Sequence, residues 1–424
     1  MKSHAAAISW TNTAGGNWSG AVNWSPNQVP GSADDAAITN GGSYTVTLDI
    51  SVTVNSLVVG GNGGGLQSFT INGPTLSVVV AGTVNESGSL TLDGGLINGA
   101  GALTLNGTNA WNGGQFGSGG GVEVTAFGTL YIGTGNDHNM PGLVLNNLGT
   151  IIRTGGRIRG GSGGVVNNGG LWVEETDNVF NQDFGGASSQ FINTGTYRKT
   201  TTGGTSTFES GFQLLNNGLV DAQTGTIEIV DGGGSGDGTW NADTNATCYF
   251  DSGYVMNDGS AFTGAGTNAL NGGITFTGRF MSENLQWQSG AIGGDGTNVS
   301  GSTLYITTGN DHNMPGAVLN NLGTVIRTGG RVRSGGGGVV TNVGLWVEET
   351  DNVFNQDYGG TASQFINLGT YRKTTTTGAS AFLSGFQLVN AGLVDAESGT
   401  IEISDGGGSG NGTWNAAANA VCDF

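Results

Sequence analysis

The chain has 424 residues, of which 85 are Gly and 5 are Pro, and its 31 acidic and 12 basic residues give a net charge of −19. This acidic balance argues against nucleic acid as a partner, because phosphates require basic surfaces. No run of eighteen apolar residues is present, which argues against a membrane span. Apolar residues still make up 36% of the chain and recur regularly, so we expect many short strands joined by tight turns rather than disorder.

Residues 1–40 differ in composition from the rest of the chain and are interpreted as an N-terminal segment with a Trp-rich cap. Residues 1–7 lack the apolar core of a signal peptide. Trp10, Trp18 and Trp24 follow within fifteen residues. Because an uncovered strand edge is open to pairing with another chain, we predict that these side chains cover the first layer of strands. The alternative is an exposed aromatic surface that stacks against sugars.

Residues 41–128 alternate between apolar and polar side chains, as strands with one buried face do. Clear examples are residues 44–48, 52–54, 76–80 and 90–92, which are separated by turns rich in Gly and Asn. We predict that this segment forms the first coils of a larger repeated structure.

A long internal repeat follows, because residues 129–250 occur again as residues 303–424 without a gap. Pairs that show the offset of 174 residues are His138 and His312, Trp172 and Trp346, and Cys248 and Cys422. Repetition of this kind indicates a repeat architecture. We therefore interpret residues 129–302 as long repeat 1 with connecting coils and residues 303–424 as a truncated long repeat 2. No linker separates them, so one continuous solenoid is expected.

A shorter period lies inside each long repeat. Gly149, Gly170, Gly195 and Gly218 follow one another at steps of 21, 25 and 23 residues, and an Asn stands two positions before each of them. A strand and turn of this length cannot bury its apolar face alone, but stacked copies can. The sequence therefore predicts an all-β fold, a single-stranded parallel β-helix (β-solenoid) with coils of about 20–25 residues. We expect the Gly residues to adopt positive φ and the Asn residues to form a ladder.

Stacking in this register predicts which side chains meet on neighbouring coils, since parallel strands lie about 4.8 Å apart. The fourth position after each Gly forms a charged column of Arg153, Glu174 and Lys199, repeated as Arg327, Glu348 and Lys373. The third position brings Arg198 over Asp221, repeated as Arg372 over Asp395. The second position forms an apolar column of Ile151, Trp172, Tyr197 and Val220.

The two cysteines, Cys248 and Cys422, lie about eight coils apart in this arrangement. A disulfide requires Cα atoms within about 7 Å, so we expect two unpaired thiols rather than an intrachain bridge. Buried thiols are the simplest interpretation.

Asp137 and His138 combine an acid and an imidazole in a stretch rich in amides, residues 135–142. General acid–base catalysis would need both side chains beside a substrate groove. Adjacent residues of a strand point to opposite faces, however, which favours a surface turn or a contact between coils. No Ser or Cys nucleophile motif with flanking glycines accompanies them.

Residues 172–183 form the most acidic stretch of the chain and lie in the 25-residue coil. Paired carboxylates could serve glycoside hydrolysis, and carboxylates with amides could bind calcium. The charged column already offers Glu174 partners, so we predict an ion-pair ladder followed by a loop over residues 176–186. The Gly-rich residues 232–238 match a calcium-binding repeat only loosely and are interpreted as a turn. We therefore assign no catalytic, cofactor-binding or metal-binding residues and no cofactor.

The strings at residues 191–200, 218–227 and 232–240 resemble the coils of large secreted bacterial β-helix repeat proteins, which are adhesin-like or autotransporter-passenger-like. Trp18, Trp24 and Pro30 are similar to the opening of many such chains. The resemblance implies a protein that is secreted or displayed on a bacterial cell surface. The resemblance covers nearly the whole chain but does not imply a particular reaction, because such folds host many functions.

The function expected from the sequence is a structural or adhesive surface solenoid without hydrolase or lyase activity, whose partners are a surface glycan or a protein ligand. The alternative is a polysaccharide lyase or glycoside hydrolase on a pectin-lyase-like β-helix. Because the sequence stops within a coil at Phe424, we expect either a fragment of a longer protein or self-association through the solenoid ends.

Overall fold

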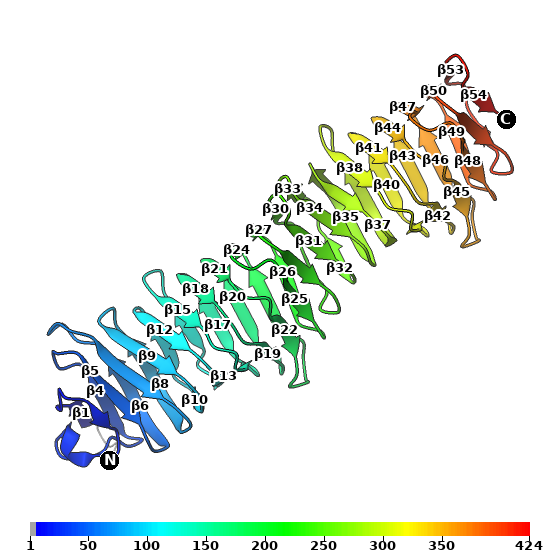
Figure 1. Ribbon diagram of the computed structural model, residues 1–424. Coiled ribbons are helices and arrows are strands. Elements are labelled where there is room, and N and C mark those ends of the chain that lie inside the picture. Colours follow the sequence, from blue (N-terminus) through cyan, green and yellow to red (C-terminus); the bar gives the residue numbers. More distant parts are fainter. Residues whose placement is uncertain (1–5) are drawn as a thin grey trace. The chain divides into compact units, whose positions relative to one another are not determined.

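The computed structural model describes residues 6–424 (Figure 1). The fold is an all-β parallel β-solenoid of about 19 turns in which 54% of the residues are in strands. The described residues contain one short 3₁₀ helix, η1 (Ala21–Asn23), and no α-helix. The predicted fold class is therefore confirmed. Residues 1–5, at the start of the predicted N-terminal segment, lie outside the described residues.

The chain divides into two compact units, Met1–Leu219 and Val220–Phe424, and each is described by itself. The division does not coincide with the expected boundaries after residues 40, 128 and 302, which stay predictions, as does the continuity of the solenoid.

The strands of the first unit are short, mostly of four or five residues. They are β1 (Ala6–Trp10), β2 (Gly16–Asn17), β3 (Trp24–Ser25), β4 (Asp34–Ile38), β5 (Tyr44–Leu48), β6 (Val52–Val59), β7 (Gln67–Ile71), β8 (Thr75–Val84), β9 (Gly88–Leu92), β10 (Leu96–Gly99), β11 (Ala102–Leu105), β12 (Thr108–Trp111), β13 (Gly114–Gly119), β14 (Val122–Val124), β15 (Thr129–Ile132), β16 (His138–Asn139), β17 (Val144–Asn147), β18 (Thr150–Arg153), β19 (Ile158–Gly160), β20 (Val165–Asn168), β21 (Leu171–Glu174), β22 (Val179–Gln182), β23 (Gln190–Asn193), β24 (Thr196–Lys199), β25 (Thr205–Glu209) and β26 (Gln213–Asn216). The strands expected within residues 44–92 are all present.

The remaining strands begin at the boundary of the two units and continue through the second. They are β27 (Leu219–Ala222), β28 (Thr226–Ile229), β29 (Gly234–Gly236), β30 (Thr239–Ala242), β31 (Thr247–Phe250), β32 (Tyr254–Met256), β33 (Ser260–Thr263), β34 (Thr267–Leu270), β35 (Ile274–Ser282), β36 (Leu285–Trp287), β37 (Gly290–Asn298), β38 (Thr303–Ile306), β39 (His312–Asn313), β40 (Val318–Asn321), β41 (Thr324–Arg327), β42 (Val332–Ser334), β43 (Val339–Asn342), β44 (Leu345–Glu348), β45 (Phe354–Gln356), β46 (Gln364–Asn367), β47 (Thr370–Lys373), β48 (Ala379–Leu383), β49 (Gln387–Asn390), β50 (Leu393–Ala396), β51 (Thr400–Ile403), β52 (Gly408–Ser409), β53 (Thr413–Ala416) and β54 (Val421–Asp423).

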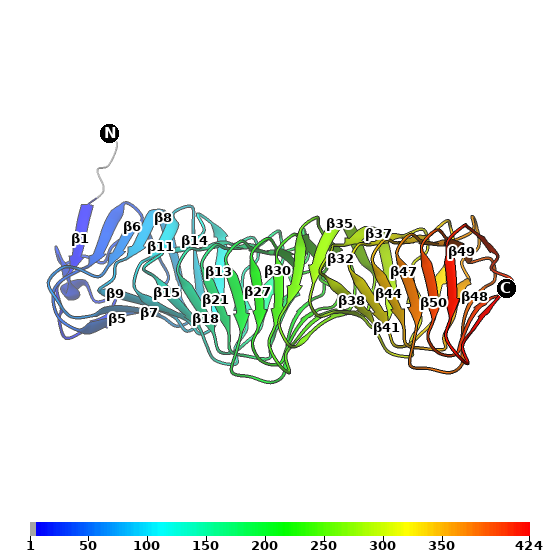
Figure 2. The ribbon, with the colours of Figure 1, turned by 90° about the horizontal axis from the view of Figure 1, so that it is seen from above.

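In the repeated stretches, residues 129–250 and 303–424, three strands make one coil, and strands three apart in the chain pair in parallel. In the first unit β17, β20, β23 and β26 stack in this way, so that Asn147, Asn168, Asn193 and Asn216 lie opposite one another. Strands β15, β18 and β21 form a second stack, visible as neighbouring arrows in Figure 2. One coil therefore corresponds to one period of the sequence, as predicted.

The interior of the coils is filled by one apolar column from each stack. The predicted column of Ile151, Trp172 and Tyr197 is fully buried. The rings of Phe180 and Phe208, on strands that pair with each other, stack with centroids 4.4 Å apart. Aliphatic and aromatic side chains at alternate positions therefore fix which face of each strand points inward.

The glycines of the short period serve a different purpose from the one expected. Gly149, Gly170, Gly195 and Gly218 do not adopt left-handed φ values. A Cβ on Gly170 would collide with the carbonyl oxygen of Gly149, and a Cβ on Gly195 would collide with that of Gly170. The expectation of positive φ was wrong, and glycine is required because the stacked backbones approach too closely for a side chain.

The predicted asparagine ladder is confirmed. The Nδ2 atom of Asn147 donates to Oδ1 of Asn168 at 2.7 Å, and Asn168 donates in the same way to Asn193 at 2.8 Å. The amides of Asn147 and Asn168 each also donate to a backbone carbonyl of the next coil, as Asn168 does to Thr196 at 3.0 Å. These side chains have no exposed surface, so the ladder satisfies polar groups that lie inside the turn.

Two segments expected to be loops or turns contain strands. Strand β22 lies within residues 176–186, where Phe180 is buried and pairs with Phe208. Strand β29 lies within residues 232–238 and pairs with β32. The long coil keeps its third strand, because an apolar side chain is needed at that place in the core.

The Trp residues of the N-terminal segment pack inside rather than facing the solvent. Trp10, Trp18 and Trp24 are at most 1% exposed. The ring of Trp24 meets those of Trp10 and Trp18 edge to face at 5.0 and 4.6 Å, and Trp18 lies 5.3 Å from Phe69 of the core. This burial agrees with the capping interpretation and contradicts an exposed surface for sugar stacking.

Candidate functional site

The charged column predicted from the sequence exists, and it lies entirely inside the first unit. Arg153, Glu174 and Lys199 are opposite one another on β18, β21 and β24, and none has any exposed surface. Nη1 of Arg153 donates to both carboxylate oxygens of Glu174, at 3.2 and 3.3 Å. The guanidinium also lies 4.6 Å from the centre of the Phe180 ring. The column is therefore part of the core.

Glu174 collects three kinds of donor in this interior. Besides Arg153, Nε1 of Trp172 donates to it at 3.1 Å, and the hydroxyl of Tyr197 donates at 3.3 Å. Burial raises the pKa of Glu174, and the charge of Arg153 opposes this shift. Burial and the neighbouring Glu174 raise the pKa of Tyr197 well above its ordinary value. The Glu174 carboxyl is therefore shielded from solvent by these core groups.

Lys199 lies opposite Glu174 as predicted and its charge acts to lower the pKa of that carboxyl, but its hydrogen bonds go to other groups. Its Nζ donates to Oδ1 of Asp177 at 2.7 Å, to the carbonyl oxygen of Thr176 at 3.0 Å and to the hydroxyls of Thr202 and Ser206 at 3.0 and 3.1 Å. Asp177 was a candidate ligand for a metal or a sugar. It instead anchors the turn after β21 to the buried ammonium group.

The second unit repeats this arrangement. Arg327 Nη1 donates to Glu348 at 3.3 Å, and Lys373 Nζ donates to Asp351 at 2.8 Å. Arg372 and Asp395 form the predicted ion pair at 3.1 Å. The corresponding Arg198 and Asp221 belong to different units, so that pair stays a prediction.

His138 is a core residue and not a partner of Asp137. Its imidazole is fully buried and meets the ring of Trp111 edge to face at 5.1 Å, and Nε2 lies 3.0 Å from the carbonyl oxygen of Gly133. Burial lowers the pKa of His138 to about 4. His312 has the same environment beside Trp287. Because Asp137 points to the outer face, the two side chains cannot act as a dyad.

Asp137 belongs instead to a partly exposed surface group, which we call the Arg–Asp cluster: Asp137, Arg157, Arg159, Asp183 and Phe184. Arg157 contacts Asp137 at 2.8 Å, and Arg159 contacts Asp137 at 3.1 Å and Asp183 at 2.6 Å. The guanidinium of Arg159 lies 4.9 Å from the Phe184 ring centre. The hydrogen bond from Arg157 lowers the pKa of Asp137.

The cluster recurs in the second unit, where its members are Asp311, Arg331, Arg333, Asp357 and Tyr358. This cluster was not predicted from the sequence, because Asp137 is adjacent to His138 in the chain whereas its arginine partners lie one coil further on. The same register that predicted the charged column places Arg159 beside Asn139 and would have pointed to it.

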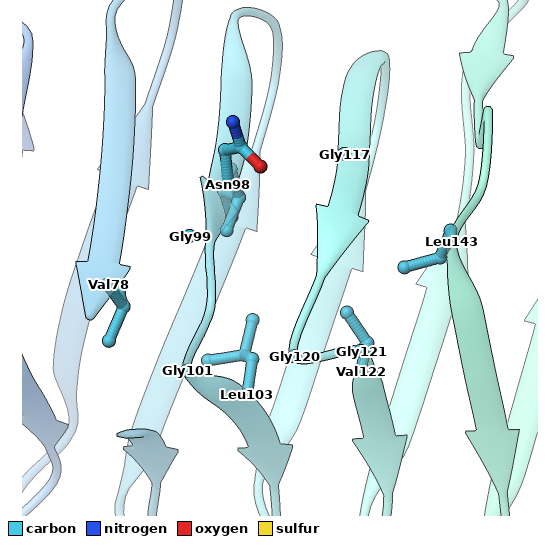
Figure 3. A pocket seen from close by; sticks show the side chains of 11 residues that line it. Val78, Asn98, Gly99, Gly101, Leu103, Gly117, Gly120, Gly121, Val122 and Leu143 are labelled. Atoms are coloured by element: carbon cyan, nitrogen blue, oxygen red, sulfur yellow. The ribbon is translucent and has the colours of Figure 1, made fainter. Parts of the chain in front are cut away.

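A small crevice in the first unit is lined mainly by glycines and aliphatic side chains (Figure 3). It has a volume of about 20 Å³, enough for about one water molecule. Val78, Leu103 and Val122 line it together with Gly99 and Gly120. A cavity of this size and composition cannot hold a substrate.

Three further observations concern thiols, metal ligands and membrane-spanning helices. Cys248 and Cys422 are free, as predicted, and burial raises the pKa of the Cys248 thiol. Within residues 6–424, no group of three or more His, Cys, Asp or Glu side chains is placed to hold a metal ion. Over the same residues, no helix has the length and apolar character needed to cross a membrane.

No protein-family model, curated protein or solved structure was found to match this chain. The function therefore has to be inferred from the geometry described above.

Proposed function

We propose that this chain is a structural or adhesive protein, secreted or displayed on a bacterial cell surface, whose coils present a surface to a glycan or a protein ligand. The main support for this proposal is that the side chains capable of acid–base catalysis lie in the core. His138, Glu174 and Lys199 are all fully buried and occupied by core contacts. The same holds for their counterparts in the second copy.

The exposed charges support a role in contact rather than in catalysis. In the Arg–Asp cluster each carboxylate pairs with both guanidinium groups, so Asp137 and Asp183 are already engaged in ion pairs. Guanidinium and carboxylate groups beside an aromatic ring can instead hydrogen-bond to hydroxyl or amide groups of a ligand. Duplication of the cluster provides two such contacts in one chain.

The cell-surface location is proposed from the resemblance of the coils to secreted bacterial repeat proteins. The net charge of −19 fits this location, because it opposes aggregation of a Gly-rich, strand-rich chain.

The test uses the full chain with a panel of acidic and neutral polysaccharides and measures two quantities on the same samples. One is binding, by biolayer interferometry, and the other is release of reducing ends or unsaturated uronates. We expect binding without product, weakened by replacing Arg159 and Arg333 with Gln. As a control, the variants must keep the circular dichroism spectrum of the parent.

Product release would favour the lyase or hydrolase alternative. That alternative would be established if turnover were lost on replacing His138 and His312, or on changing Asp177 and Asp351 to Asn, while the fold was kept.

A further inference from the structure

The second unit carries an apolar ridge that the first copy of the repeat lacks. The ridge residues stand at the same corner of four successive coils, one position before the Gly of each coil. They are Leu322, Val343, Leu368 and Ala391. The first three are 43%, 48% and 51% exposed, and Ala391 is also exposed.

The ridge residues are stacked in register. The backbone N–H groups of Val343, Leu368 and Ala391 each donate at 2.8 Å to the carbonyl oxygen of an Asn in the preceding coil. Their spacing along the stack is therefore about 4.8 Å, one strand separation. The side chains therefore form a continuous line along the stack rather than scattered apolar residues.

The first copy of the repeat provides the comparison. Leu148 occupies the corner that corresponds to Leu322, but Gly169, Thr194 and Asn217 stand at the other three. Three differences between two otherwise similar copies therefore fall at one corner, and each makes that corner more apolar in the second copy. The fold does not require this change, because the same coil is built with the first set of residues.

Charge also distinguishes the ridge from its surroundings. In a chain of net charge −19, the two residues on either side of each ridge position include no charged side chain. Part-exposed aliphatic side chains lie beside it, Ile366 and Val389 on one side and Leu345 and Leu393 on the other. The strip is thus a place where two acidic chains can approach without bringing like charges together.

We propose that the ridge binds the ridge of a second copy of this chain, antiparallel and about a two-fold axis. A two-fold axis between the coils of Val343 and Leu368 sets these two residues opposite each other across the interface. It also sets Leu322 opposite Ala391. Each facing pair then joins a larger with a smaller side chain, so the line is complementary to itself, as an isologous contact requires.

The size of the ridge sets the strength of the contact. Four aliphatic side chains, each about half exposed, present roughly 200 Å² of apolar surface. A stable dimer buries about 800 Å² per partner, so this pairing belongs to the weak, transient class even with the flanking side chains included. We expect a Kd on the order of 10⁻⁴ M. Weak lateral contacts are suited to surfaces on which many copies are held close together.

The experiment measures the mass of the full chain by sedimentation equilibrium over a concentration series that spans this Kd. The test variant replaces Val343 with Gly, Leu368 with Thr and Ala391 with Asn, which are the residues of the first copy. We expect the parent to dimerise and the variant to dimerise on the order of tenfold more weakly or not at all, with an unchanged thermal melting curve. A monomeric parent at all concentrations, or a variant that dimerises like the parent, would overturn the proposal.

A converse variant keeps the test decisive if the first variant is destabilised. Gly169→Val, Thr194→Leu and Asn217→Ala give the first copy its own ridge. The nearest atom to a Cβ at Gly169 is 3.6 Å away, an ordinary contact, so a Cβ is accommodated at this position. We expect this chain to associate beyond the dimer, since it carries two ridges. Association identical to that of the parent would contradict the assignment of the contact to this corner.

Discussion

Replacing Glu174 with Gln is expected to lower the free energy of unfolding of the surrounding coils by about 3 kcal/mol at pH 7. The Glu174 carboxylate has no exposed surface and receives hydrogen bonds from Arg153, Trp172 and Tyr197. Gln keeps an oxygen for some of these donors but leaves the buried Arg153 without a counter-charge. Breaking a buried ion pair costs about 3–5 kcal/mol, and the retained hydrogen bonds place Gln at the lower end.

Native-state hydrogen exchange measured by mass spectrometry can locate this effect, because the chain contains its own reference. Amides of β18, β21 and β24 should exchange about 100-fold faster, since each 1.4 kcal/mol corresponds to a factor of ten. The equivalent strands around Glu348 should be unchanged. Peptides from the two copies differ in mass, for example through Phe184 and Tyr358. Glu175→Gln serves as a control at a part-exposed neighbour, with a change below about 0.5 kcal/mol.

The effects of changing Arg153 and Glu174 are also expected to be coupled. Arg153→Met alone should be as damaging as Glu174→Gln, whereas the two changes combined should cost much less than their sum, because no buried charge is then left unpaired and Gln still accepts from Trp172 and Tyr197. Strictly additive effects, or a cost below 1 kcal/mol for Glu174→Gln, would refute the view that Glu174 carries the charge that balances Arg153.

Three other predictions concern the core. Burial lowers the pKa of His138 and His312 from 6.5 to about 4, so their contribution to stability is present above pH 6.5 and is lost as the pH falls toward 4. Changing both to Gln should flatten the pH dependence of the free energy of urea unfolding by about 1.4 kcal/mol per pH unit for each residue. Asn168→Ala should destabilise by about 2 kcal/mol in the same assay because it leaves ladder partners unpaired, while Asn167→Thr, the residue of the second copy, should change little. Trp24→Ala should cost about 3–5 kcal/mol and speed hydrogen exchange in the first coils, and a loss below 1 kcal/mol would contradict its role in the cap.

The sequence by itself determined the fold class, the length of the coils and the register. These follow from local periodicity. A Gly with an Asn two positions before it, as at Gly149 and Gly170, recurs once per coil, so the coils can be aligned without knowing how each coil closes. The same alignment placed Arg153 opposite Glu174, which the structure confirms.

Only the tertiary structure decided which of these side chains are buried and what they contact. A coil closes through three strands, so the partner of Lys199 comes from a turn, at Asp177, rather than from the column above it. The same closure buries His138 while leaving Asp137 outside with Arg157 and Arg159. Inward or outward orientation depends on how the backbone bends between strands, and a one-dimensional period does not contain that information.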